Sequence, residues 1–278
     1  MSFFATARNS FIIVFMATRP LRTYLAIYLV STGTLTYEIG LMNLFSLAQG
    51  YHFAFMVISI ALMGIGAGGA VLMATGWSGG QQGGEGGGGE GGEGAARLLS
   101  VLAALLCAAS VLCYMAANAL LFDPVKAAWS RSEFGKILAQ YLMLSIPFVF
   151  SGAIVSAAIR AMSERVHRLY LADMVGAGTG CVLILLVLTV SGGEGAVIVA
   201  AFLFFTAALL FRTPSRLIEA ALPASALILL ALAAFLPGNW LEARVSPYRD
   251  LSAALNFPGG RVLETVHSPS GRLDVVES

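Results

Sequence analysis

The chain has 278 residues, of which 58% are hydrophobic and 11% are charged, and its formal net charge is +1. A soluble domain carries about 25% charged residues, so this composition cannot cover a water-facing surface. It predicts an integral membrane protein that lies in a lipid bilayer, and the near-neutral charge gives no case for a nucleic-acid partner. Cys107, Cys113 and Cys181 lie in apolar segments at spacings that match no zinc or haem motif, so we interpret them as packing residues. We therefore expect no metal and no cofactor in this chain.

Segment 1–22 contains Arg8 and a short apolar run from Phe11 to Ala17. Because no small-residue cleavage site follows the run, we do not interpret it as a signal peptide. We expect a cytoplasmic or interfacial helix here, followed by a transmembrane helical domain over 23–237.

Seven stretches reach the roughly 20 apolar residues that a bilayer-spanning helix needs. Their apolar runs are continuous rather than alternating, which indicates helices and not barrel strands. The predicted fold class is an all-α integral membrane bundle of about seven transmembrane helices with a short soluble tail that resembles a β-hairpin. The expected spans are 23–47, 53–76, 97–121, 137–159, 169–190, 195–212 and 217–236.

Two of the expected loops have distinct compositions. Loop 78–94 is almost wholly glycine and predicts a flexible tether. It is not a phosphate-binding loop, because no Lys-Ser/Thr follows it and no strand precedes it. Loop 122–136 carries Trp129 among basic residues, which is typical of an amphipathic segment in the membrane interface.

Basic residues gather on one side of this expected topology. The short loops of the opposite side hold only Lys126, Arg131 and Lys136. Cytoplasmic loops carry the excess of Lys and Arg, so we expect a cytoplasmic N-terminus and, with seven spans, an extracytoplasmic tail. The basic side holds Arg8, Arg19, Arg22, Arg97, Arg160, Arg165, Arg168, Arg212 and Arg216.

Tail 238–278 holds two alternating segments, Arg261–His267 and Arg272–Glu277, with a Ser-Pro-Ser-Gly turn between them. This pattern predicts a β-hairpin. A lone hairpin is marginal in water, so we expect another protein chain, the membrane domain or the remainder of a β-domain to cover the tail.

Two glycine clusters imitate nucleotide-binding motifs but lie inside expected spans. Gly64 and Gly68, like Gly176 and Gly180, are spaced four residues apart, which lets two helices approach closely. We interpret both clusters as helix-packing seams, and we expect the two seams to meet in the bundle.

Glu38 lies in the middle of the first expected span, where a charge is costly and indicates function. Either it is protonated and donates a hydrogen bond between helices, or it pairs with or binds a cation. Asp173 is its expected companion carboxylate. The candidate intramembrane polar site is Glu38, Asp173, Tyr37, Asn43 and His52, and no arrangement of catalytic residues is evident.

Several of these motifs resemble the membrane half of bacterial fused spermidine synthase-like proteins. The matching stretches are Tyr37–Ile39 with LMNLFS after it, His52–Met56, GIGAGG, Tyr170–Ala177, Ser246–Tyr248, Pro258-Gly259 and Ser268–Glu277. The resemblance implies that the tail leads into a small β-domain before an aminopropyltransferase-like domain. Met42 and Asn43 depart from the Trp or Arg of many relatives, and the catalytic half has no counterpart here.

The resemblance conflicts with the expected topology, because an enzyme that uses decarboxylated S-adenosylmethionine should face the cytoplasm. Either an eighth span exists, for which the run beginning at Phe11 is the candidate, or the soluble half has another function outside the cell. Three functions stay open. The chain is a membrane module that anchors or partners an aminopropyltransferase-like domain, a transporter of a polyamine or another cation, or a non-catalytic subunit of a larger complex.

Overall fold

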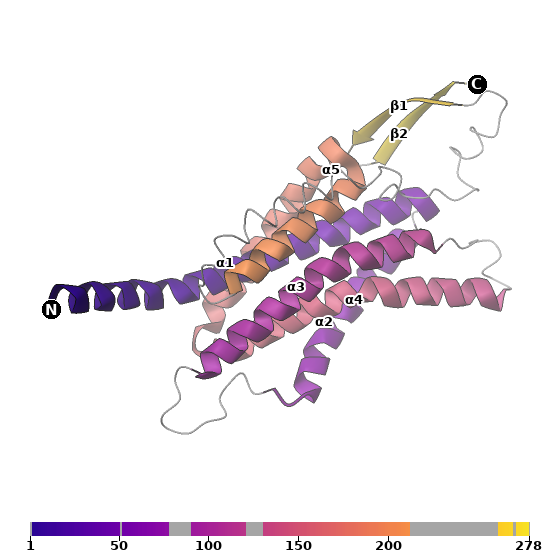
Figure 1. Cartoon of the computed structure of the whole chain (residues 1–278). Coiled ribbons are helices and arrows are strands. Elements are labelled where there is room, and N and C mark those ends of the chain that lie inside the picture. Colours follow the sequence, from indigo (N-terminus) through magenta and orange to yellow (C-terminus); the bar gives the residue numbers. More distant parts are fainter. Residues whose placement is uncertain are drawn as a thin grey trace.

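The computed structural model describes residues 2–50, 52–77, 90–120, 130–211, 261–268 and 271–277. These residues form five long helices, a single 3₁₀ turn and a two-stranded sheet (Figure 1). The helices are α1 (Ser2–Gln49), α2 (His52–Ala74), α3 (Glu90–Ala119), α4 (Arg131–Ala161) and α5 (Val166–Phe211), η2 is Ser163–Arg165, and the strands are β1 (Arg261–Ser268) and β2 (Gly271–Glu277).

The predicted all-helical bundle is confirmed, but the described residues form five helices rather than seven. All five are long and apolar enough to cross a membrane. The predicted spans 169–190 and 195–212 belong to one element, α5, and the predicted span 217–236 lies outside the described residues. The structure therefore fits a multi-pass membrane protein.

Two boundaries differ from those expected. α1 begins at Ser2 and continues through residue 22 without a break, and its first part extends beyond the bundle (Figure 1). α3 begins at Glu90, so the last residues of the expected glycine tether are helical.

α5 is a helical hairpin with two arms, 166–191 and 193–211. Gly192 is its one residue with non-helical backbone angles, at φ 68° and ψ −167°. The first arm runs parallel to α1, because Gly176 lies against Tyr28 and the bend at Gly193 lies against Leu44. A positive φ is strained for residues with a side chain, so glycine suits this reversal.

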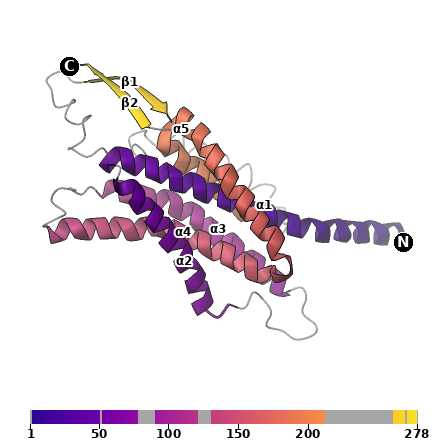
Figure 2. The same ribbon diagram turned by 180° about the vertical axis from the view of Figure 1, so that it is seen from behind.

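The second arm returns along α1 in the opposite direction. A β-carbon added at Gly40 would overlap the side chain of Ala196, and one at Gly33 would lie 2.6 Å from the ring of Phe204. As the residue number rises along the second arm, the contacted residue number in α1 falls, so the two segments are antiparallel. Seen from behind, α5 lies folded beside α1 (Figure 2).

α1 is the central helix of the bundle. It contacts α2, α4 and both arms of α5, and the hydroxyl of Tyr37 donates to the Ser110 carbonyl of α3 at 2.9 Å. In the most apolar stretch of α1, 61% of the stretch is buried inside the bundle. The buried share of the corresponding stretch in each of the other helices is 33% to 56%. Most polar side chains in this stretch of α1 therefore lie between helices rather than on the outer surface of the bundle.

The two glycine seams pack against different helices. A β-carbon at Gly64 would lie 2.6 Å from the β-carbon of Phe148 in α4, and one at Gly68 would overlap the Val149 carbonyl oxygen. Gly176 and Gly180 instead lie against α1. The expectation that the two seams meet is wrong, because small residues permit close approach without choosing the partner helix.

Hydrogen bonds define one end of the bundle, which we call the Arg160 end. The Arg160 guanidinium donates to the Trp77 carbonyl at 2.9 Å, which ties the end of α4 to the residues after α2. The Ser100 hydroxyl donates to the Ala208 carbonyl at 3.0 Å, which places the beginning of α3 beside the end of α5.

The opposite end of the bundle, the Gly192 end, contains the bend of α5. The side-chain amide of Gln140 donates to the Ala117 carbonyl at 3.3 Å, which joins the beginning of α4 to the end of α3. The predicted turn between the first two spans also lies here, and Gly50 makes it at φ 120°. The backbone N–H of Gly50 donates to the Ser46 carbonyl at 3.1 Å and closes α1.

The predicted C-terminal hairpin is confirmed. β1 and β2 pair antiparallel from Arg261 opposite Glu277 to Ser268 opposite Gly271, with an irregularity between Val262 and Glu264. The Arg261 guanidinium and the Glu277 carboxylate form an ion pair at 2.6 Å across the open end. Both views place the hairpin beside the Gly192 end (Figures 1 and 2).

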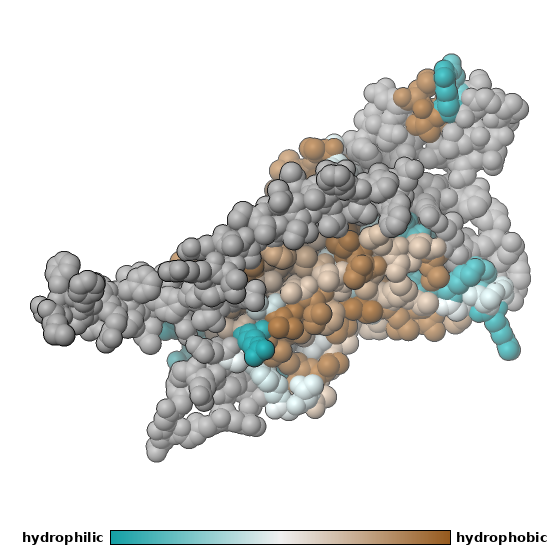
Figure 3. Space-filling view, viewed as in Figure 1, coloured by the Kyte–Doolittle hydropathy of each residue, from teal (hydrophilic) through white to brown (hydrophobic). Residues whose placement is uncertain are grey.

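The outer surface of the helices is strongly apolar. In the space-filling view, hydrophobic residues cover the middle of the bundle and hydrophilic ones lie toward its ends (Figure 3). This distribution fits contact with lipid around the middle of the helices. The exposed residues include Phe55, Leu62 and Met73 of α2, Leu112 of α3, and Val182, Leu186 and Val190 of α5.

Candidate functional site

The candidate site is built on a polar stretch of α1, residues 31–38, which reads STGTLTYE. Its hydroxyl groups are satisfied close by. Thr32 donates to the Tyr28 carbonyl at 2.7 Å, and Thr36 donates to the Thr32 carbonyl at 2.8 Å. Because these hydroxyls bond to the helix backbone, α1 can carry them in apolar surroundings.

Asp173 is joined to this stretch directly. The Ser31 hydroxyl donates to the Asp173 carboxylate, and one turn away Thr32 also donates to the Gly176 carbonyl at 3.0 Å. The absence of a side chain at Gly176 lets α1 and the first arm of α5 come close enough for both bonds. The structure therefore places Asp173 against α1, the helix that carries Glu38.

Glu38 lies two helical turns beyond Ser31. Seven residues correspond to roughly 10.5 Å along an α-helix and nearly return to the same face. Glu38 and Ser31, the residue of α1 that contacts Asp173, therefore lie on one face of α1, about two turns apart. No hydrogen bond joins Glu38 to Asp173. Glu38 is partly buried and forms no hydrogen bond or ion pair with the described residues.

Tyr37 faces another direction. Its side chain is 1% exposed, and its hydroxyl reaches the Ser110 carbonyl of α3. Its ring centroid lies 5.7 Å from that of Phe148 in α4. Tyr37 thus ties α1 to α3 and α4 in the core rather than lining a space beside Glu38.

Asn43 and His52 lie closer to the Gly192 end. A β-carbon added at Gly193 would lie 3.3 Å from the Asn43 side-chain oxygen, so Asn43 faces the bend of α5. His52 is the first residue of α2, and its side chain lies outside the described part of the structure. Of the four candidates whose side chains the structure describes, only Glu38 and Asp173 lie toward the same face of α1.

A third acidic residue, Glu194, was missed in the sequence. It follows the bend of α5, and its carboxylate is close enough to act electrostatically on Tyr114 of α3, which is 1% exposed. Its position in Ser191-Gly-Gly-Glu-Gly195, between two expected spans, resembles a solvent-facing loop. Only the folded bundle shows that Glu194 lies within electrostatic range of a buried phenol.

Two further polar side-chain features lie between the helices, one contact and one buried oxygen without a partner. The hydroxyls of Thr34 in α1 and Ser151 in α4 lie 2.8 Å apart and are both buried. The carbonyl oxygen of the fully buried Gln140 side chain has no hydrogen-bond partner in the described structure. Interhelical bonds of this kind stabilise bundles in apolar surroundings.

Within the described ranges, no three His, Cys, Asp or Glu side chains are grouped so that they could hold a metal ion. The three cysteines are free thiols, and Cys107 donates to the Ala201 carbonyl at 3.3 Å, which joins α3 to the second arm of α5. Comparison of the chain with family models, with curated proteins and with solved structures gave no match.

Proposed function

We propose that this chain is the multi-pass membrane module of a spermidine synthase-like protein, in which it anchors or partners a soluble aminopropyltransferase-like domain. The observation that supports the proposal best is the hairpin at the Gly192 end. Its strands expose apolar side chains, with Leu263 57% and Leu273 66% exposed. A two-stranded sheet needs further strands or a covering surface for stability, and a docked domain supplies it.

The positions of the chain segments support a tail on the side opposite the N-terminus. Phe211 ends α5 at the Arg160 end, whereas Arg261 begins β1 beside the Gly192 end. In this proposal the bundle lies in a bacterial inner membrane with the Arg160 end in the cytoplasm and the docked domain outside.

The docking proposal is tested with a photo-cross-linking residue placed at Leu263 or Leu273 in cells that make the protein natively. We expect a cross-linked product whose partner carries an aminopropyltransferase-like domain, identified by mass spectrometry of its peptides. The same probe at Val190, which is 82% exposed on α5, is the control and should not capture that partner. A partner without such a domain would exclude the spermidine synthase-like proposal, and no product at either strand position would exclude docking.

A second candidate function is transport of a polyamine or another cation. It is favoured by Glu38 and Asp173 on one face of α1, because intramembrane carboxylates mark cation pathways. Uptake of labelled spermidine into proteoliposomes should fall by more than about tenfold with Glu38→Gln, which corresponds to about 1.4 kcal/mol of lost cation binding. Glu133→Gln, at the beginning of α4, is the matched control. Unchanged uptake with Glu38→Gln would exclude this function.

A further inference from the structure

The turn between α4 and α5 carries a concentrated positive charge. Arg160, Arg165 and Arg168 contribute three positive charges and Glu164 one negative charge, which leaves +2 when His167 is neutral. The chain reverses here over the single 3₁₀ turn η2. All of these charges therefore lie within one short stretch at the Arg160 end of the bundle.

The charge of this turn is available to a ligand. Arg165 and Arg168 are exposed, and neither guanidinium forms a hydrogen bond or ion pair with a described residue. Residues 161–165, with Arg165 among them, line a shallow pocket that is open to the surroundings. Arg160 is held at the edge of the turn by its bond to the Trp77 carbonyl.

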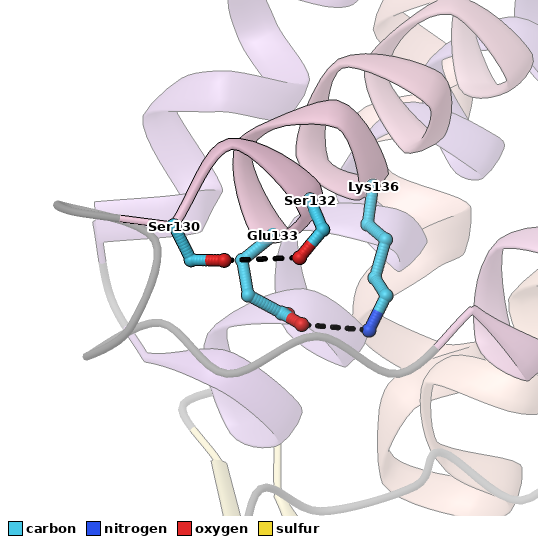
Figure 4. A network of polar contacts seen from close by, with 4 residues as sticks. All are labelled: Ser130, Ser132, Glu133 and Lys136. Atoms are coloured by element: carbon cyan, nitrogen blue, oxygen red, sulfur yellow. Dashed lines mark hydrogen bonds and ion pairs between the residues drawn. The ribbon is translucent and has the colours of Figure 1, made fainter.

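The beginning of α4, at the opposite end, is a useful contrast. Lys136 pairs with Glu133 at 2.7 Å, and the Ser130 and Ser132 hydroxyls lie 2.9 Å apart beside them (Figure 4). The Glu133 carboxylate therefore offsets the charge of Lys136. Arg131 is the other basic residue of residues 130–136, so this described stretch has a net charge of +1, against +2 at the α4–α5 turn.

Exposed apolar side chains lie next to the basic turn. Leu171 is 62% exposed and Met174 is 46% exposed on the first arm of α5, within two turns of Arg168. Ile159 on α4 is 38% exposed one residue before Arg160. The molecule thus presents cationic side chains directly beside an apolar surface. This arrangement is complementary to an anionic phospholipid, whose negative headgroup is attached to apolar acyl chains.

We propose that the α4–α5 turn binds the phosphate-bearing headgroup of an anionic phospholipid, with the acyl chains along the exposed apolar faces of α4 and α5. Guanidinium groups form strong, charge-assisted hydrogen bonds with phosphate oxygens. The adjacent apolar faces favour a lipid over free phosphate. This site rests on the proposal that the helices cross a membrane, but it does not depend on the docked domain or on cation transport.

The test uses the purified full chain in detergent and measures bound phosphatidylglycerol by native mass spectrometry. Basic side chains near an anionic surface contribute about 1 kcal/mol each, so Arg165→Gln with Arg168→Gln should weaken retention roughly tenfold to thirtyfold. Arg165→Lys with Arg168→Lys should retain most of the lipid. Glu164→Gln removes the negative charge and should strengthen retention, which a purely structural role for the turn would not predict.

Arg131→Gln with Lys136→Gln at the Gly192 end is the matched control, and it should leave retention unchanged. Phosphatidylcholine in place of phosphatidylglycerol should bind equally to all variants. Excess glycerol phosphate should compete poorly if the acyl chains contribute, whereas full competition would identify a soluble phosphate ligand and overturn the lipid assignment. Equal retention by the native chain and the turn variants would also overturn it. Alkali extraction of membranes checks that each variant still inserts. A variant that resists extraction but binds the lipid as the native chain does contradicts the lipid site and not the membrane insertion.

Discussion

At the scale of single residues, the polar side chains of α1 are located where the helix is surrounded by other helices. Ser31, Thr32 and Thr34 all bond across to another element, and Tyr37 does so through its hydroxyl. An unpaired hydroxyl in apolar surroundings costs free energy, so these contacts fix how α1 is rotated. A run of hydroxyl residues in an apolar segment therefore indicates an internal helix.

The bond between Ser31 and Asp173 should contribute a measurable coupling free energy. In a double-mutant cycle of Ser31→Ala and Asp173→Ala, we expect a coupling of about 0.6 kcal/mol, with about 1.7 kcal/mol as the upper bound known for membrane helices. Unfolding in mixed detergent micelles measures it. Thr179, whose hydroxyl bonds only within its own helix, replaces Ser31 in the control cycle and should give no coupling.

Close approach of α2 and α4 predicts opposite results for two neighbouring glycines. Gly68→Ala should lower the free energy of unfolding by about 1–3 kcal/mol, because the new methyl group overlaps the Val149 carbonyl oxygen. Gly66→Ala has nothing within 4 Å of the new group and should be neutral or slightly stabilising. Equal effects of the two substitutions in thermal unfolding would contradict the packing of α2 on α4.

Sequence reasoning identified the residue types of the site better than their grouping. The membrane cost of a charge singled out Glu38 and Asp173. Asp173 contacts α1 through Ser31, and Glu38 follows Ser31 by seven residues, which places it toward the same face of α1. Tyr37 and Asn43 point elsewhere, because the rotation of each side chain depends on which helices surround α1. Glu194 was missed because a carboxylate flanked by glycines reads as a loop when the partner helix is unknown.

At the scale of elements, α5 shows how one residue can reverse a helix. The apolar pattern gave two spans with edges near residues 190 and 195, and the two arms match them closely. It did not show that the connection needs only Gly192. Hydropathy measures the length of a helix but carries no information on backbone angles, so it could not show that spans 169–190 and 195–212 join as one element. The remaining expected span, 217–236, lies outside the described residues.

Gly192→Ala should destabilise the hairpin of α5. At φ 68° and ψ −167° an alanine is strained, and the cost should be about 1–3 kcal/mol in unfolding experiments. Gly178→Ala is the matched control on the first arm, since a β-carbon there has nothing within 4 Å. A stability loss at Gly178 as large as that at Gly192 would argue against a strained bend.

At the scale of the whole molecule, the charges and the chain path give the same polarity. Arg97, Arg165 and Arg168 are exposed at the Arg160 end, whereas Lys136 at the Gly192 end is paired. The hairpin lies beside the Gly192 end (Figure 1). A difference in unpaired positive charge between the two ends orients a multi-pass protein in the membrane.

Thiol labelling in intact cells tests this polarity. In a chain whose three cysteines are replaced by alanine, we expect a membrane-impermeant reagent to label Lys136→Cys and Leu273→Cys from outside. Arg165→Cys should be labelled only after the membrane is opened. If Leu273→Cys behaves like Arg165→Cys, the hairpin lies on the cytoplasmic side and the proposed external docking fails.

The central position of α1 also has a consequence during synthesis, because α1 is made long before the α5 residues that enclose it. Ser31 and its partner Asp173 are 142 residues apart, which is about 7 to 30 seconds of translation at 5–20 residues per second. Through that interval the hydroxyls and the carboxylate of α1 have no α5 to contact. We expect α1 to stay in contact with the membrane-insertion machinery during this interval. In stalled translation intermediates that end after α4, α1 should therefore still cross-link to that machinery. The first helix to be made is thus the last to be enclosed.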